Sequence, residues 1–378
     1  MTLSISSNNT TFTNSNQQDV PGVIITHSPA STNIFIGSPS IVILPNGNYV
    51  ASHDYFGKGT TNNQACIYTS QDKGNSWTKL TVLDRQWWST LFVHNNELYI
   101  MGVNRKYGDT VIRRSTDEGK TWTVPNDENT GLLLFGKEYH CSSVPVVVHN
   151  GRIWRAMEER NPPEGWGWSL RSFVMSAPVT SNLLKSKNWL SSNQLKYENI
   201  WPGKAWLEGN IVVSPKGGVC NVLRHHTEAG GTAIITEISK NGKRTLFNPE
   251  TGFIKFPGGS KKFTIRYDSI SKQYWALSNY VPEKHKNTIA EKIRNTVALI
   301  SSPDLLKWTI KSIVLFHPDY KKIGFQYADW QFENEDIIFI SRTAFMDKYG
   351  GAPNNHDANL LTFHRIEKFR SLNLSPAI

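Results

Sequence analysis

The sequence predicts an all-β fold, a closed β-propeller of four-stranded antiparallel blades, and two repeated patterns support this prediction. One is a turn motif, Ser-x-Asp-x-Gly-x-Thr/Ser-Trp, which occurs at residues 70–77 and again 45 residues later at 115–122. A third copy at 302–308 keeps the Ser, the Asp and the Trp but lacks the Gly. The other pattern is a series of apolar hairpins at similar intervals. Units repeated at this spacing are typical of propellers, whose blades bury their faces only by stacking on one another.

The turn motif has a local physical logic. Its Asp carboxylate and Ser hydroxyl can hydrogen-bond to backbone N–H groups of the turn, and its Gly permits a positive φ. The Trp begins the next strand and can pack between two sheets. We therefore expect Trp77, Trp122 and Trp308 to be buried at equivalent outer-strand positions of three blades.

Six hairpins alternate apolar runs with tight polar turns, as the inner strands of successive blades should. They span residues 40–51, 90–100, 144–154, 210–220, 263–275 and 327–339. Two apolar runs, 23–27 and 359–366, have no partner in this scheme, and together they could complete one shared blade. Closure of the ring by both chain ends would remove open sheet edges. The count is six blades.

Composition bounds the function. The 378 residues read as a tail over 1–20 and one propeller domain over 21–378, which we expect to be a monomer. A net charge of +10 without a basic run favours an acidic partner over nucleic acid.

Cys66, Cys141 and Cys220 lie in apolar runs and are expected to be buried free thiols. No apolar run is long enough to cross a membrane. No secretory signal is recognisable, so location stays open between secretion of a processed chain and the cytoplasm.

The pocket of a propeller lies at its axis, so polar residues that flank inner strands are the candidates for function. Histidines recur there, with general acid/base capacity near neutral pH, and arginines there suit a carboxylate. We assign catalysis to His53, His140 and Arg224. We assign substrate binding to Trp88, Tyr139, Glu208, His225, Arg342 and His356. The alternative for each is a structural role, a hydrogen-bonded histidine or an inter-blade salt bridge.

Metal ligands are sparse in the sequence. It contains no closely spaced histidine pair of the His-x-x-His type, so no transition-metal site is expected. The residues leave open one cofactor, a structural Ca²⁺ ion near the axis that Asp54, Asp357 and Asn359 could hold.

The turn motifs are Asp-boxes, and the chain resembles the sialidase-like propellers that carry them. As a family, sialidases combine an Arg-Ile-Pro-type N-terminal motif and an arginine triad with a Tyr/Glu nucleophile couple and an Asp acid. Neither Arg-Ile-Pro nor Arg-Leu-Pro occurs in this chain. The resemblance therefore supports the fold and disfavours sialidase activity.

Three runs, 37–57, 149–158 and 356–365, resemble a different group of propeller enzymes. These enzymes cleave the terminal L-rhamnose-α-1,4-D-glucuronate linkage of arabinogalactan and gum arabic. The resemblance extends over about residues 21–370 and is most specific at His53-Asp54. It implies catalysis by His53 and seven blades, with one blade hidden in 232–258.

The resemblance implies a polysaccharide lyase that acts on an acidic polysaccharide by β-elimination. Elimination at a uronate needs a base for the C5 proton and cations on the carboxylate, which His and Arg can supply. Hydrolysis would instead favour a pair of carboxylic acids. The alternatives are an α-L-rhamnosidase that acts on the same linkage and a glycan-binding propeller without catalysis.

Overall fold

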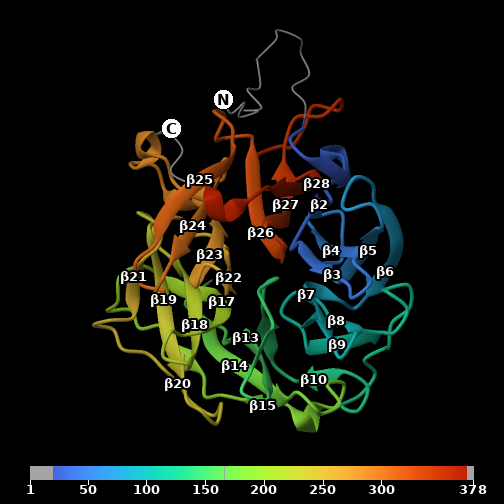
Figure 1. Ribbon diagram of the computed structural model, residues 1–378, viewed down its shortest axis with the longest axis vertical. Coiled ribbons are helices and arrows are strands. Elements are labelled where there is room, and N and C mark those ends of the chain that lie inside the picture. The colour runs from blue at the N-terminus through green and yellow to red at the C-terminus, as the bar shows by residue number, and fades with distance from the viewer. Residues whose placement is uncertain (1–19, 166, 373–378) are drawn as a thin grey trace.

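The computed structural model describes residues 20–165 and 167–372. These residues form six antiparallel sheets arranged as blades around a central axis (Figure 1). The six hairpins found in the sequence supply two inner strands of each blade, so the predicted count of six is confirmed. The expectation of a seventh blade is wrong, because residues 232–258 hold the outer strands β19, β20 and β21 of the fourth blade.

Each blade follows the preceding one along the chain. The strands of blades 1 to 3 are β2 (Phe35–Ile36), β3 (Ser40–Ile43), β4 (Tyr49–Phe56), β5 (Gln64–Ser70) and β6 (Thr78–Asp84); β7 (Trp87–His94), β8 (Glu97–Val103), β9 (Thr110–Ser115) and β10 (Leu132–Leu134); and β11 (Glu138–His140), β12 (Val147–His149), β13 (Arg152–Arg160), β14 (Leu170–Pro178), β15 (Leu190–Ser191) and β16 (Leu195–Lys196). Those of blades 4 to 6 are β17 (Ala205–Val213), β18 (Val219–His226), β19 (Thr232–Ile238), β20 (Thr245–Leu246) and β21 (Phe253–Lys255); β22 (Thr264–Asp268), β23 (Gln273–Ser278), β24 (Thr296–Ser302) and β25 (Thr309–Phe316); and β26 (Gly324–Glu333), β27 (Asp336–Ala344), β28 (Leu360–Ile366) and β1 (Val23–His27).

Helical structure in the described residues is limited to short 3-10 turns, namely η1 (Ala30–Thr32), η2 (Ser186–Asn188), η3 (Glu283–His285), η4 (Ala290–Lys292) and η5 (Phe369–Ser371). None of the helices in the described part of the chain has the length and apolar character needed to cross a membrane.

The two ends of the chain close the ring, as the sequence predicted. Strand β1 pairs with β28 in antiparallel register, with Val23 opposite Phe363 and His27 opposite Leu360. Blade 6 therefore takes its outermost strand from the start of the chain (Figure 1). The tail predicted over residues 1–20 lies outside the described residues except for Val20.

The core lies between neighbouring blades. Ile41 of blade 1 packs with Ile340 of blade 6, and Met101 of blade 2 packs with Ile153 of blade 3. Because both faces of each inner strand meet another blade, the strands carry apolar side chains on both sides. The three cysteines are buried and free, as predicted.

The two complete Asp-boxes have the expected geometry. In the first, Gly74 N–H donates to Ser70 Oγ over 2.9 Å, Ser76 N–H donates to Asp72 over 2.9 Å, and Gly74 has a φ of 92°. The indole N–H of the Trp donates back to the Gly carbonyl in both boxes. The turn is thus held by its own side chains.

The third Asp-box is one residue shorter, and Leu305 takes the position of the Gly with a φ of 69°. Trp308 still donates to the Leu305 carbonyl, over 2.8 Å. The three Trp residues do occupy equivalent positions, each packed against the cluster shared with the preceding blade. They are half-buried rather than fully buried, since the indole N–H is tied to a turn at the rim.

Candidate active site

Three innermost strands carry the same irregularity near the axis. In β7, β17 and β26 a β-bulge sets two residues opposite one of the neighbouring strand. The first bulged residue is Trp88, Glu208 or Tyr327, with φ of 48°, 55° and 55°. A bulge in this conformation re-aims its side chain, and all three side chains line one central cavity.

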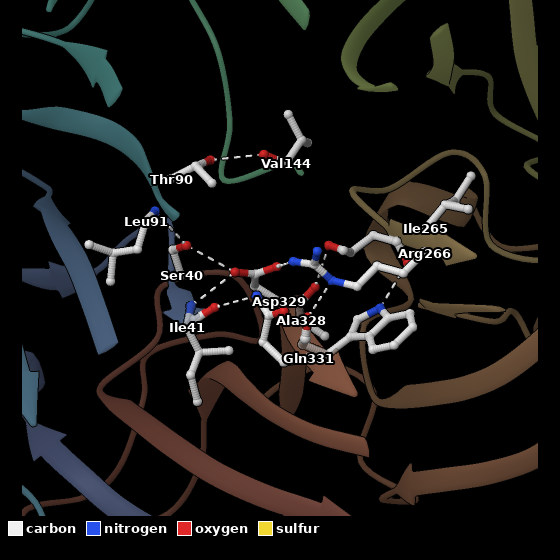
Figure 2. Close-up of polar contacts among 12 residues, drawn as sticks. Ser40, Ile41, Thr90, Leu91, Val144, Ile265, Arg266, Ala328, Asp329 and Gln331 are labelled. Carbon is white, nitrogen blue, oxygen red and sulfur yellow. Dashed lines mark hydrogen bonds and ion pairs between the residues drawn. The ribbon is translucent and has the colours of Figure 1, made fainter. Parts of the chain in front are cut away.

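A polar residue that follows each bulge ties its blade to the next one. Thr90 Oγ1 donates to the Val144 carbonyl over 3.0 Å, and Asn210 accepts from Ile265 N–H over 3.0 Å. Asp329 accepts from both Ser40 Oγ and Ile41 N–H over 2.9 Å. Figure 2 shows Asp329 between the residues of blade 1 and Arg266 of blade 5. These contacts fix the bulges in blades 2, 4 and 6.

The cavity at the axis has a volume of about 720 Å³ and is lined by both charged and aromatic side chains. Its lining includes four cationic side chains, Lys58, Lys106, Arg224 and Arg342, and two acidic ones, Asp54 and Glu208. The remaining lining residues are Gly37, Ser38, Phe56, Gly57, Thr60, Asn62, Trp87, Trp88, Tyr107, His140, Leu207, Tyr327 and His356. The excess of cations suits an anionic ligand.

Of the nine site residues predicted from the sequence, six line this cavity: Trp88, His140, Glu208, Arg224, Arg342 and His356. The other three, His53, Tyr139 and His225, do not. Each of these three is the strand neighbour of a residue that does, namely Asp54, His140 and Arg224. Successive side chains of a strand point to opposite faces, so the prediction selected the right segments and missed the face by one position.

His53 is buried between blade surfaces rather than at the cavity. Its Nδ1 lies 2.9 Å from the Asp54 carbonyl and its Nε2 3.3 Å from the Tyr68 hydroxyl. Burial lowers the pKa of His53 to about 4, so the ring is neutral at physiological pH. Tyr139 packs in the core shared by blades 2 and 3, and His225 lies at a separate cavity beside blade 4.

Asp54 lines the cavity and was overlooked as a catalytic candidate. Its two carboxylate oxygens accept from Ser38 N–H over 2.8 Å and from Trp88 N–H over 2.7 Å. Gly37 makes room for it, because a Cβ on Gly37 would lie 1.5 Å from Asp54 Oδ1. Burial raises the pKa of Asp54 to about 7 despite these hydrogen bonds. A carboxylic acid that is partly protonated at neutral pH can act as a general acid.

Glu208, Arg224 and Tyr327 form a connected group in the cavity. Arg224 Nη1 donates to Glu208 over 2.9 Å, and both side chains are buried. Burial opposes ionisation of Glu208, but Arg224 and the nearby Tyr327 outweigh it and hold its pKa below the usual value. Burial and Glu208 raise the pKa of Tyr327, while Arg224, Arg342 and Arg294 act in the opposite direction.

Arg342 is held by stacking more than by hydrogen bonds. Its guanidinium lies over the rings of Phe56 and Tyr327, 4.5 and 4.9 Å from their centroids. Nη2 donates to the His356 carbonyl over 2.6 Å, but the buried Nε has no partner among the described residues. Stacked in this way, the guanidinium keeps donors free for an anion.

The predicted Ca²⁺ ligands are hydrogen-bonded to other residues. Asp54 accepts from two backbone N–H groups, Asp357 bonds to His356 and Asn354, and Asn359 bonds to Phe345 and Asp347. Within the described residues no group of three or more His, Cys, Asp or Glu side chains could hold a metal ion. A structural Ca²⁺ ion near the axis therefore stays a prediction.

No protein family model matches the chain, and no curated protein matches its sequence. Solved structures do. An α-L-arabinanase of Penicillium chrysogenum is similar over 94% of this chain and 100% of its own, with 13% identity and a TM-score of 0.58. The Hadza microbial sialidase Hz136 is similar over 93% of this chain and 69% of its own, with 11% identity and a TM-score of 0.63. A Trypanosoma rangeli sialidase is similar over 87% of this chain and 54% of its own, with 14% identity and a TM-score of 0.57. At these identities the likeness shows the propeller fold.

Proposed function

We propose that the chain is a glycoside hydrolase that releases a terminal acidic sugar with retention of configuration. The observation that carries this proposal is that Tyr327 and Glu208 line the same cavity as Arg224 and Arg342 and lie close enough for each to shift the pKa of the other. A tyrosine beside a carboxylate base has the arrangement of an activated nucleophile. Tyr/Glu nucleophile couples, arginines and an Asp acid are also the elements of the sialidase family that the Asp-boxes resemble.

In the proposed mechanism Arg342 and Arg224 bind the carboxylate of the sugar. Asp54, protonated in part because of burial, donates its proton to the glycosidic oxygen as the bond to the leaving group breaks. Tyr327 attacks the anomeric carbon and passes its proton to Glu208. Asp54 then takes a proton from water, which displaces Tyr327 and releases the sugar, and Glu208 returns the proton to the phenol.

The type of nucleophile points to the type of sugar. A carboxylate nucleophile would be repelled by a carboxylate attached directly to the reacting carbon, because like charges at short range repel strongly. A neutral phenol avoids this repulsion until the bond forms. A tyrosine nucleophile therefore favours a 2-keto acid sugar such as a sialic acid. The chain lacks the Arg-Ile-Pro motif of sialidases, but Arg342 and Arg294 add positive charge beside Tyr327.

The structural neighbours support a glycan as the substrate, since their names describe an arabinanase and sialidases. Fluorogenic glycosides of N-acetylneuraminic acid, glucuronic acid and arabinofuranose would test the proposal. We expect cleavage of an acidic glycoside, and its loss in Arg342→Met, which keeps the length of the side chain. Cleavage of the neutral arabinofuranoside alone would contradict the proposal.

β-Elimination at a rhamnose-glucuronate linkage is the second candidate. It is favoured by His140, a histidine in the cavity that could remove the C5 proton of a uronate. Gum arabic separates the two reactions, because elimination creates an unsaturated uronate that absorbs ultraviolet light, whereas hydrolysis, including α-L-rhamnosidase action, does not. Rapid growth of that absorbance would favour the lyase.

A further inference from the structure

The proposed hydrolysis does not use a buried pair of residues, one of which, His140, lines the cavity. His140 on β11 and Glu158 on β13 are directly opposite each other in the antiparallel register. His140 Nδ1 lies 2.8 Å from Glu158 Oε2, and the two residues are 6% and 1% exposed. A pair this deeply buried is expensive to maintain unless its members are well bonded. This cost calls for an explanation.

The geometry defines which ring nitrogen is available. The Glu158 carboxylate can only accept, so Nδ1 of His140 carries a proton, and in the neutral ring Nε2 then holds a lone pair. Nε2 has no hydrogen-bond partner among the described residues, and it is not one of the fully buried unpartnered atoms. Since His140 lines the cavity, Nε2 opens into it.

The surroundings hold the ring in this orientation. The indole of Trp88 meets the His140 ring edge-on, with centroids 4.4 Å apart, and Trp88 is itself fixed by its bulge. Cys141, the next residue, donates from Sγ to the Trp88 carbonyl over 3.0 Å. The His140 ring is therefore preorganised before any ligand arrives.

We propose that His140 is a substrate-binding residue that accepts a hydrogen bond from a hydroxyl or amide N–H of the acidic sugar, and that Glu158 is the positioning residue that fixes its tautomer. The inference rests on the proposed function for the presence of an acidic sugar. Arg224 and Arg342 offer only donors, so an acceptor from blade 3 adds a second, different requirement. The sugar must carry a carboxylate for the arginines and a donor for His140.

Two variants isolate the acceptor. In His140→Gln the side-chain amide can donate to Glu158 and still present its carbonyl oxygen to the cavity. In His140→Leu the acceptor is lost and Glu158 has no partner. With N-acetylneuraminic acid and glucuronic acid as probes, calorimetry should show about tenfold weaker binding of the preferred acid to His140→Leu. We expect His140→Gln to stay within about threefold of wild type.

Nuclear magnetic resonance of the full chain with ¹⁵N-labelled histidine supplies a readout that is independent of activity and of the stability of the Leu variant. The signal that disappears in His140→Gln identifies His140. We expect Nδ1 to be protonated and Nε2 to lack a proton in the free protein, and the Nε2 signal to shift when the acid binds.

The outcomes separate the two proposals. A proton on Nε2 in the free protein, or an Nε2 signal that is unchanged at saturation, overturns the inference. Binding that is lost in Arg342→Met but unaltered in His140→Leu also overturns it and leaves the proposed function intact. Binding that depends on His140 without any hydrolysis supports the inference and contradicts the hydrolase. If neither acid binds wild type, both proposals fall.

Discussion

Blades 2, 4 and 6 build the central cavity in a different way from blades 1 and 3. Blades 2, 4 and 6 keep long innermost strands and insert a bulge that turns Trp88, Glu208 or Tyr327 toward the axis. Blades 1 and 3 instead break the innermost strand into two short pieces, β2 with β3 and β11 with β12, each pair bonded to one second strand. These interruptions bring the bulged residues into the cavity, whereas Arg224 and Arg342 reach it from the regularly paired strands β18 and β27.

The two constructions place different chemistry in the cavity. The bulges supply the couple of Tyr327 and Glu208 at backbone positions fixed by inter-blade hydrogen bonds. The broken strands expose Asp54 and His140, whose bonding partners lie behind them or on a neighbouring loop. The proposed nucleophile and base therefore come from even blades, and the proposed acid comes from an odd one.

The largest effect should follow from a change at an even blade, Tyr327→Phe. Loss of the phenolic oxygen removes the proposed nucleophile, so kcat should fall at least about 10⁴-fold. Steady-state kinetics on the preferred acidic glycoside would measure it. Binding of the free acid sugar should change little. Retention of more than a tenth of the activity would mean that Tyr327 is not the nucleophile.

The next effect concerns the junction between an even and an odd blade. Asp329→Ala removes the carboxylate that forms an ion pair with Arg266. It also removes the acceptor for the hydrogen bonds from Ser40 and Ile41. Breaking a buried charged pair costs about 3–5 kcal/mol, so chemical denaturation should show a loss of that size. Asp329→Asn keeps an acceptor and should lose less. Equal losses would mean that the acceptor does not matter.

A change at an odd blade, Asp54→Asn, should lower kcat by about 10²-fold, because a positioned acid contributes at least that much. In the wild type, activity should decline as the pH rises above about 7, where Asp54 loses its proton. The variant should lose this decline. A wild-type profile that stays level through this pH would contradict the role of Asp54 as acid.

The same residue affects stability with a defined sign. The pKa of Asp54 is about 7 in the folded protein and about 4 when unfolded. Between these values the folded state keeps a proton that the unfolded state has lost, so stability falls as the pH rises through this window. Asp54→Asn should flatten that decline, which melting curves across the window would show.

The smallest effect is expected for Thr90→Val in blade 2. Thr90 donates one neutral hydrogen bond to Val144 at 3.0 Å, and such a bond contributes about 1 kcal/mol. Denaturation should show a loss of that size with unchanged kcat. A loss as large as that of Asp329→Ala would mean that all even blades depend equally on their inter-blade bonds.

Much of the fold was predictable from the sequence. The Asp-boxes are local motifs whose hydrogen bonds depend on a few adjacent residues, and the hairpins show as alternating apolar runs. Strand pairing of residues 23–27 with 359–366 followed from the lack of any other partner. The seventh blade entered only through resemblance, and the outer strands of blade 4 are too short to form another sheet.

The site was less predictable, because its geometry depends on faces and bulges. The prediction named His53, but its neighbour Asp54 lines the cavity. Because side chains alternate between the two faces of a strand, an error of one residue places the predicted side chain on the wrong face. Tyr327 was overlooked because a bulge reverses the face of every residue after it. One signal was present in the sequence: Trp88-Ser89-Thr90, Glu208-Gly209-Asn210 and Tyr327-Ala328-Asp329 share a large, small, polar order at intervals of 120 and 119 residues.

The most direct test of the account is to trap the bond to Tyr327. A fluorinated acidic glycosyl fluoride, which forms a glycosyl-enzyme rapidly and hydrolyses slowly, would be incubated with wild type and Tyr327→Phe. Mass spectrometry of the digested protein should find the sugar on the peptide that contains Tyr327 in the wild type and no adduct in the variant. An adduct on another residue, or hydrolysis of an acidic glycoside without any adduct, would contradict the role of Tyr327 as nucleophile.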